Sequence, residues 1–424
     1  MTLRSATSSL LRRLLSDERG NVFTILAFAL PVLIGCAGLA VDTIQWVYAK
    51  RNLQASADSA AIAGVLGLVQ GSDMDEAVDR NLASRAGLDP ARSVSAERSP
   101  EGYGEDPFAV RVRISTPVRL TFSSLFLRTR PSISVEATAT IVESGDFCTF
   151  ALGGDDETGV RIEPGSDLEM ECGIASNSSS AKAIEADGSA SVSAVKVTAF
   201  GGIGLDGMGS AKLRPYGVRQ KDPLEGTEPP LVPNTGCPNV TVNADAAQSN
   251  GGPITLEPGC FGNLVLNGPV TLGDGEFILN RGNLIVGPTA EVSCKACTIF
   301  LTSDQAAENP TSIGKVQIDG HAKVKLAAPT EGPNAGILIY QDRHAAGDHD
   351  GIENVIGGNS FSQLKGLVYL PAETLRVDGR WTPDVQCARF VGKRLILQGR
   401  LMIAKDCDSN GVIKLRLTDV KLVA

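Results

Sequence analysis

Aromatic side chains and positive charge are both scarce in this sequence. Phe, Tyr and Trp make up 5% of the 424 residues, which leaves few rings for stacking against sugars. The formal net charge is −9, whereas proteins that bind nucleic acid concentrate Lys and Arg on their binding face. Composition therefore argues against a nucleic-acid partner and against a glycan site built on aromatic platforms.

Several catalytic signatures are also absent. The sequence contains no G-x-S-x-G elbow, no P-loop and no H-E-x-x-H zinc motif. Three adjacent acidic residues occur in GGDDETG at 153–159, and enzymes that cleave glycosidic bonds place two carboxylates across a groove. Adjacent acids between glycines are more typical of a solvated turn. We therefore expect no catalytic residues, no cofactor and no enzyme activity.

Only three histidines are present, and two of them lie in DRHAAGDHDG at 342–351. This string makes the best metal-like cluster in the sequence. It can be interpreted as a solvated polar loop or as a calcium-type site. Because no ligand-bearing helix supports it, we favour the loop and assign no metal site. The residues of the cluster are His344, Asp348, His349 and Asp350.

Charge is absent from the 20 residues between Val22 and Val41. At about 1.5 Å per residue, a helix of this length spans about 30 Å, the thickness of a bilayer core. Signal-peptide cores are shorter, at about 7–15 residues, and no cleavage site is evident here. We predict a retained transmembrane helix that, with its continuation, occupies residues 22–70 and tolerates Pro31.

Positive charge is distributed unevenly around this span. Lys50 and Arg51 follow it at a distance of several residues. The positive-inside rule places residues 1–21, a basic N-terminus, in the cytoplasm. We therefore predict a single-pass inner-membrane protein whose C-terminal region lies in the periplasm. The arginines that precede the span are Arg4, Arg12, Arg13 and Arg19.

Small residues recur every four positions after the span, at Ser56, Ala60 and Gly64. Such a stripe allows another helix to approach closely. We predict a helix-partner face here, through which a homo-oligomer can form. The alternative is an alanine-rich surface helix without a partner.

Four strings in this region carry a resemblance to a known family. They are RGN at 19–21, ALP at 29–31, GLAVD at 38–42 and LQASADSAA at 53–61. Over residues 10–70 they resemble the N-terminal segment of TadG-like proteins, which belong to the Tad/Flp pilus-assembly system. The resemblance implies a membrane protein with pilus-assembly proteins or pilus subunits as partners.

The sequence departs from related Tad pseudopilins at one point. Those proteins are cut after a glycine, and a Glu stands five residues beyond that glycine. In this sequence the residue five positions beyond Gly20 is Ile25. We therefore expect an uncut membrane protein. Longer family members carry a von Willebrand A-type domain with an Asp-x-Ser-x-Ser metal site. We do not assign that metal-dependent adhesion function to this protein.

The next segment, residues 71–146, is predicted as a small α+β module. Apolar residues recur at helical spacing between Asp73 and Ala86. A loop rich in Pro, Gly and charge follows at 89–107. Strands are then predicted at 108–115, 118–126 and 132–142, where apolar and polar residues alternate.

Helical periodicity is nearly absent from residues 147–424. Short apolar runs alternate there with Gly, Asn, Asp and Pro, as in NLVLNGPVTLGDGEF at 263–277. A β-sandwich or barrel and a parallel β-solenoid are both compatible with this texture. Short strands and Asn at turns favour the β-solenoid (β-helix-like) domain. The overall fold class is then mainly β.

Two features interrupt this β-rich region. Residues 209–239 hold six of the 22 prolines, which predicts a surface loop across the solenoid or a break between two halves of it. Later, an L-x-G-x-x-Y-x-P string resembles the C-terminal part of Tad-associated exported proteins. We expect its residues to serve packing. They are Leu364, Gly366, Tyr369 and Pro371.

Eight cysteines lie beyond the span, and Cys36 lies within it. An even number on one side of a membrane suits disulfides in an oxidising compartment; the alternative is scattered buried thiols in a cytosolic protein. CKAC at 294–297 lacks the context of a redox or zinc motif, which favours a disulfide at a turn. Sequence neighbours suggest the pairs Cys148–Cys172, Cys237–Cys260, Cys294–Cys297 and Cys387–Cys407, among 105 pairings.

These observations predict a membrane-anchored periplasmic component of Tad/Flp pilus assembly or surface attachment that acts as a scaffold. Two alternatives stay open. One is a membrane-tethered β-helix enzyme or binder that acts on envelope polysaccharide. The other is a surface adhesin released by processing.

Overall fold

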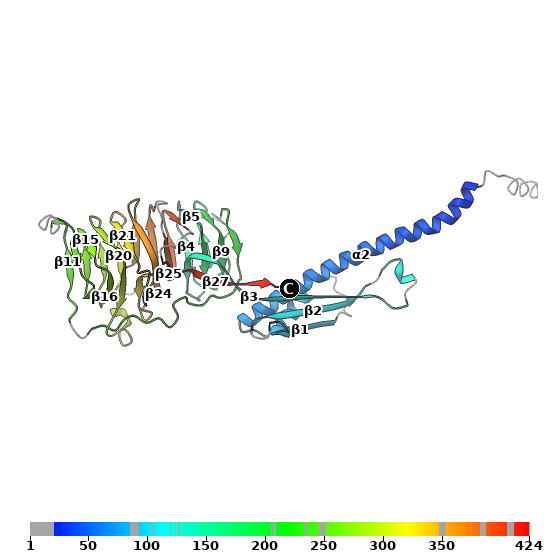
Figure 1. Cartoon of the computed structure of the whole chain (residues 1–424), viewed down its shortest axis with the longest axis horizontal. Coiled ribbons are helices and arrows are strands. Elements are labelled where there is room, and N and C mark those ends of the chain that lie inside the picture. The colour runs from blue at the N-terminus through cyan, green and yellow to red at the C-terminus, as the bar shows by residue number, and fades with distance from the viewer. Residues whose placement is uncertain are drawn as a thin grey trace, which may run out of the picture. The chain divides into compact units, whose positions relative to one another are not determined.

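The computed structural model describes most of the chain in two compact units (Figure 1). One unit contains the residues up to Ile141 together with the C-terminal residues from Lys421, and the other contains Val142–Val420. The structure describes residues 21–423, with the exception of residues 85–92, 104–105, 119, 126–127, 205, 207–208, 234–235, 246–251, 347–352, 382–386 and 405–410.

The first unit is built on a single long helix, α2 (Asn21–Val69), which contains Pro31. A short helix, α3 (Met74–Ala83), follows it. Asp73 caps α3 by accepting a hydrogen bond from the backbone N–H of Glu76 at 2.9 Å, which satisfies one of the free amides of the first turn. This helix confirms the helical spacing in the sequence and ends three residues earlier than expected.

Three antiparallel strands complete the first unit: β1 (Ser93–Arg98), β2 (Val110–Pro117) and the first part of β3 (Ser132–Ala151). Two predictions fail here. β1 falls in the segment that was expected to be a loop. The segment 118–126, expected to be a strand, instead contains the 3-10 helix η2 (Ser123–Leu125).

The second unit consists of short strands that pair in parallel with the third strand along the chain. The first ladder begins with β11 (Val240–Val242), β14 (Leu264–Leu266), β17 (Leu284–Val286), β20 (Val316–Ile318) and β23 (Asn354–Gly358). It continues through β24 (Gln363–Gly379), β25 (Cys387–Leu397), β4 (Val160–Ile162) and β7 (Ile184–Ala186).

Two further ladders run beside the first. The second contains β12 (Ile254–Leu256), β15 (Pro269–Leu272), β18 (Glu291–Cys294), β21 (Lys323–Ala327) and the start of β24. The third contains β13 (Gly259–Phe261), β16 (Gly275–Asn280), β19 (Cys297–Thr302), β22 (Ile337–Gln341), β24, β25, β3, β6 (Gly173–Ser176), β9 (Lys196–Ala199) and β10 (Lys212–Arg214).

A separate three-stranded parallel sheet contains β26 (Arg400–Ile403), β5 (Asp167–Met170) and β8 (Ser191–Ala194). The remaining elements are the 3-10 helix η3 (Pro310–Ser312) and β27 (Leu415–Leu422). The prediction of a mainly β chain with one long apolar N-terminal helix is therefore confirmed.

The order of strands in the ladders differs from their order along the chain. The chain enters the stack at β3 and leaves its first segment at β10. It then restarts at β11, which pairs only with β14 among the described strands. At the end of the second segment, β25 pairs with both β3 and β4. The last strands therefore lie beside the first ones, as the colours in Figure 1 show.

The core of the second unit comes from alternate residues of each strand. Val160 and Ile162, at the two ends of β4, are fully buried, whereas Arg161 between them is exposed. Asparagines link successive repeats at one corner. The side-chain oxygen of Asn239 accepts from the amide of Asn263 at 2.6 Å, and that of Asn263 accepts from Asn283 at 2.8 Å. These bonds satisfy turn amides that no strand pairing reaches.

Candidate functional site

The first half of α2 carries a continuous apolar surface. It is the one helix in the described residues that is long and apolar enough to cross a membrane. Phe23 is 80% exposed, Phe28 is 78% exposed and Leu33 is 61% exposed. Exposed apolar surface of this extent marks an interaction or membrane site. The other exposed large apolar residues of this half are Ile25, Leu26, Leu30, Val32, Ile34, Leu39, Val41, Ile44, Val47 and Tyr48.

The second half of α2 is covered by its own unit. The predicted partner-face residues Ser56, Ala60 and Gly64 are all buried. A Cβ on Gly64 would lie 2.9 Å from a methyl of Val110 in β2 and 3.2 Å from a methyl of Val78 in α3. The small-residue stripe therefore admits the sheet and α3 of this chain. Contact of α2 with a helix of another molecule stays a prediction.

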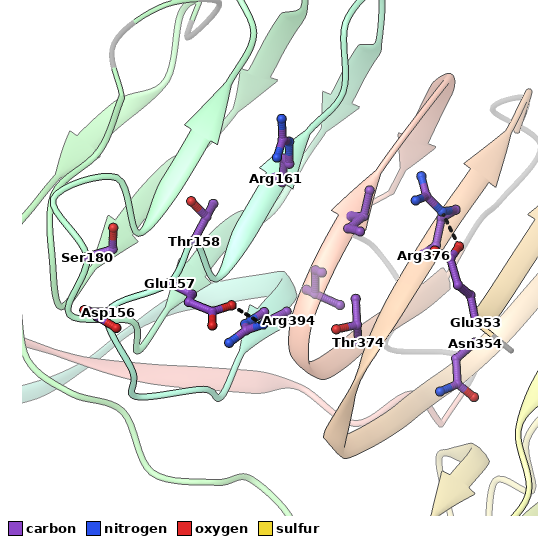
Figure 2. A pocket seen from close by; sticks show the side chains of 12 residues that line it. Asp156, Glu157, Thr158, Arg161, Ser180, Glu353, Asn354, Thr374, Arg376 and Arg394 are labelled. Carbon is purple, nitrogen blue, oxygen red and sulfur yellow. Dashed lines mark hydrogen bonds and ion pairs between the residues drawn. The ribbon is translucent and has the colours of Figure 1, made fainter. Parts of the chain in front are cut away.

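A groove of about 480 Å³ lies over the first ladder of the second unit (Figure 2). Four neighbouring strands form it: β23, β24, β25 and β4. Three arginines and three acidic residues line it, together with the hydroxyl groups of Thr158, Ser180 and Thr374. The charged residues are Arg161, Arg376, Arg394, Asp156, Glu157 and Glu353.

Sheet register explains how the arginines come together. Arg376 pairs with Ile396, and Ile396 pairs with Arg161. Since strands are about 4.8 Å apart, the two arginines stand on the same sheet face about 10 Å apart. This arrangement was not predicted from sequence, because Arg161 and Arg376 belong to segments that are far apart along the chain.

The acidic loop at 153–159 contributes to this groove. The Arg394 guanidinium donates to Asp155 at 3.0 Å and also forms an ion pair with Glu157. At the other side, Arg376 forms a 3.0 Å ion pair with Glu353 (Figure 2). Glu157 and Glu353 are therefore held by arginine partners, and the groove offers fixed charges of both signs and several hydroxyl groups.

A row of apolar side chains follows the outer face of the third ladder. We call it the aromatic row: Ile278, Phe300, Tyr340, Tyr369, Val391 and Phe150, which are register partners in that order. The ring centroids of Phe300 and Tyr340 are 5.7 Å apart, and those of Tyr340 and Tyr369 are 5.2 Å apart. All six side chains are buried.

Residues 215–233, which we call the strap, cover this row together with residues of β27. The Tyr369 hydroxyl donates to Asp222 at 2.6 Å, and the Tyr340 hydroxyl donates to the carbonyl of Thr227 at 2.5 Å. Arg343 donates to the carbonyl of Leu224 at 2.8 Å. The strap lies in the predicted proline-rich loop 209–239, which both crosses the stack and separates its two segments.

Burial under the strap changes the acidity of the two tyrosines. It raises the pKa of Tyr340 to about 12. It also raises the pKa of Tyr369, to which the neighbouring Asp222 carboxylate contributes. Both hydroxyls therefore stay protonated as hydrogen-bond donors to the strap. Tyr369 belongs to the L-x-G-x-x-Y-x-P string, and its burial agrees with the packing role expected there.

Disulfides link segments of the second unit that lie about one repeat apart or at one corner of a repeat. The structure contains Cys148–Cys172, Cys237–Cys260 and Cys294–Cys297, the pairs suggested by proximity in sequence. Cys294 and Cys297 are buried at a corner between β18 and β19, which is unlike an accessible redox motif. Cys387 is disulfide-bonded, and its expected partner Cys407 lies outside the described residues.

No group of three potential metal ligands is found among the described residues. His344 contacts Asp342 at 2.8 Å, while Asp348, His349 and Asp350 lie outside the description. The sequence does contain one Asp-x-Ser-x-Ser string, at 187–191. There the backbone and hydroxyl of Ser189 donate to Asp187 and lower its pKa, in a turn between β7 and β8.

Comparison with known proteins bears on α2 alone. No curated protein and no solved structure matches the chain. A family model does match residues 20–71, which include both the exposed and the covered half of the helix. The matching family is described as putative Flp pilus-assembly TadE/G-like. Over residues 20–71, the N-terminal segment of this chain is therefore similar to the TadE/G-like family.

Proposed function

We propose that this protein is a non-enzymatic, membrane-anchored scaffold of Tad/Flp pilus assembly, with its second unit in the periplasm. One observation carries the proposal: the TadE/G-like match covers the helix whose first half is apolar and exposed. A bilayer is the environment that such a surface requires. The covered half then ties the anchor to a folded unit.

The three ladders support the finer part of the fold. We infer that they form the faces of a parallel β-solenoid, since strands from β11 to β20 pair with the third strand along the chain in unbroken register. Such a stack offers long, rigid faces to partners. The three disulfides of the described residues suit an oxidising compartment.

Deletion of the gene, with complementation by the full chain, tests the proposed role. Pilus number per cell should fall on deletion and return with the wild-type chain. Complementation with Leu33→Arg, which puts a charge into the exposed half, should fail. Leu231→Arg is the matched control, because Leu231 is 94% exposed in the second unit. Unchanged piliation on deletion would contradict the role in pilus assembly.

The cellular location needs a separate measurement. A C-terminal alkaline phosphatase fusion should be active, and a C-terminal green fluorescent protein fusion exported through the Sec pathway should be dark. Both results follow from a cytoplasmic N-terminus and one span. Fluorescence together with an inactive phosphatase would place the second unit in the cytoplasm and overturn the periplasmic assignment.

The charged groove favours a second candidate function, the binding of envelope polysaccharide. Arginine–carboxylate pairs and hydroxyls can form several hydrogen bonds to sugar hydroxyls or uronic acids. Titration of the detergent-solubilised full chain with purified envelope glycan tests it. Binding should be lost in Arg376→Ala and kept in Arg416→Ala, a control whose arginine pairs with Glu143 away from the groove. Equal binding by both variants would exclude the groove.

A further inference from the structure

The loop between β2 and β3 contacts α2 beside its exposed apolar half. Asp42, immediately after the uncharged run, is only 3% exposed. One of its carboxylate oxygens accepts from the backbone N–H of Phe122 at 3.0 Å. The other accepts from both the backbone N–H and the hydroxyl of Ser123. A single carboxylate thus binds three donors of the loop.

Two neighbouring positions of α2 support the same contact. Gln45, one turn after Asp42, donates to the hydroxyl of Thr121 at 2.9 Å. Gly38, one turn before it, leaves room for the Phe122 ring, since a Cβ there would lie 2.8 Å from ring carbons. Gly35 has nothing within 4 Å of its Cβ position. The loop therefore reaches the helix within the uncharged run.

Apolar surface continues on α2 beyond Asp42. Ile44 is 70% exposed, Val47 is 44% exposed and Tyr48 is 67% exposed. Trp46 and Tyr48 are residue types that favour the headgroup level of a membrane. A carboxylate below that level is energetically costly unless partners compensate it. The three loop donors provide that compensation.

We propose that residues 120–124 form a second membrane contact, which reaches below the headgroup level beside Asp42 and thereby fixes the depth of α2. Arg128 and Arg130, exposed at the end of the same loop, then face anionic phospholipid headgroups. The partner is the bilayer surface. The inference rests on the proposed anchoring of α2, and it places the exit of the helix near Tyr48 rather than at Val41.

Depth-dependent fluorescence quenching in vesicles tests the proposal. The full chain, with Cys36→Ser to avoid a second label, is labelled with an NBD fluorophore at Ser124→Cys. It is reconstituted into phosphatidylcholine–phosphatidylglycerol vesicles that contain dibrominated lipid. Quenching at 124 should be at least as strong as that at Tyr48→Cys, since Asp42 lies about 9 Å deeper along the helix than Tyr48. Ser95→Cys, on the exposed side of β1, should not be quenched.

A label at Phe28→Cys separates the two hypotheses. Strong quenching at 28 without quenching at 124 overturns the loop contact and leaves the anchor intact. Absence of quenching at both positions overturns the anchor itself. Asp42→Ala should abolish quenching at 124 and preserve it at 28. Preserved quenching at 124 would show that Asp42 does not position the loop.

A second variant covers the case in which Asp42→Ala does not fold. Gly38→Leu removes the space for Phe122 and should also release the loop, whereas Gly35→Leu should leave it in place. Replacing Arg128 and Arg130 together by Ala should reduce quenching at 124 in vesicles with phosphatidylglycerol. In pure phosphatidylcholine the double variant and the wild type should agree. An equal loss in both lipids would contradict headgroup binding by the arginines.

Discussion

Two rows of apolar side chains differ in what covers them: one lies on the outer face of the third ladder, and the other lies along the first half of α2. The aromatic row on the third ladder is covered by the strap and by β27, so that Phe300 is 1% exposed. The apolar half of α2 has no such cover in the described residues, and Phe28 is 78% exposed. The first row is buried by other segments of the same chain. The second row requires an apolar environment that the described residues do not supply.

This comparison teaches that apolar content alone does not identify a membrane segment. Both rows contain Phe, Tyr, Ile and Val. They differ in their neighbours: the aromatic row has carbonyl and carboxylate acceptors from the strap within reach of its tyrosine hydroxyls. In α2 such polar partners first appear at Asp42 and Gln45, where the helix meets the β2–β3 loop.

The largest expected effect is on the free energy of unfolding, when a Phe in each row is replaced by Ala. Phe300→Ala should lower the unfolding free energy of the second unit by about 3–5 kcal/mol, because it leaves a cavity under the strap. Phe28→Ala should leave that free energy unchanged. Chemical denaturation of the full chain in detergent, followed by Trp381 fluorescence in a Trp46→Phe background, measures both. Equal effects would show that the two rows are not distinct.

The next largest expected effect comes from a charge in the apolar half of α2, which we call the uncovered row. Leu33→Arg should disfavour membrane insertion by about 2.5–3.5 kcal/mol, since a charged side chain near the centre of a span is poorly solvated. An insertion assay with glycosylation sites on both sides of the span measures the inserted fraction. Tyr48→Arg should cost much less, because a long basic side chain there can reach the interface. Normal insertion of Leu33→Arg would argue that α2 does not span.

A smaller effect tests what holds the strap. Tyr369→Phe removes the hydroxyl that donates to Asp222 and should destabilise the second unit by about 1.5–3 kcal/mol, the range for hydrogen bonds to charged groups. Tyr216→Phe is the control, because Tyr216 is 64% exposed. Proteolysis of the strap should accelerate only in Tyr369→Phe. An unchanged rate of proteolysis would show that apolar packing alone holds the strap in place.

The last expected effect is a dependence on alkaline pH. The pKa of Tyr340 is raised in the folded state to about 12 from 10.0, so the folded chain holds this proton more tightly than the unfolded chain does. The stabilisation is complete below pH 10 and is lost between pH 10 and 12, at about 1.4 kcal/mol per pH unit. Denaturation of the wild type and Tyr340→Phe across this range measures it. A wild-type profile as flat as that of the variant would contradict strap burial of Tyr340.

The uncovered row could be predicted from sequence, because the absence of charge over 20 residues is a local property. The cover over the aromatic row could not, since the strap binds strands more than a hundred residues away, as in the contact between Asp222 and Tyr369. The failure at 118–126 has a similar cause. The amides of Phe122 and Ser123 bind Asp42 rather than a neighbouring strand, and alternation of residues carries no information about such a partner.

The groove was predictable only in part. The sequence identified the acidic loop at 153–159 and predicted a solvated turn there. That prediction did not include the arginines that distant segments bring to the loop. Arg394 meets Asp155 across 239 residues of sequence. Single strands of three or four residues carry no signal of which distant strand they will join, so neither the groove nor the reordered ladders could be read from the pattern of apolar residues.

The meeting of β25 with β3 and β4 has a consequence for biogenesis. The strands at 147–214 emerge first during synthesis, yet one side of their sheets has no neighbour until residues 387–403 follow. Contacts between residues so distant in sequence form slowly. An exposed parallel edge is open to wrong pairing in the meantime. A nascent chain thus holds an unpaired sheet edge until residues 387–403 have been made, and a chaperone that covers this edge would favour correct pairing.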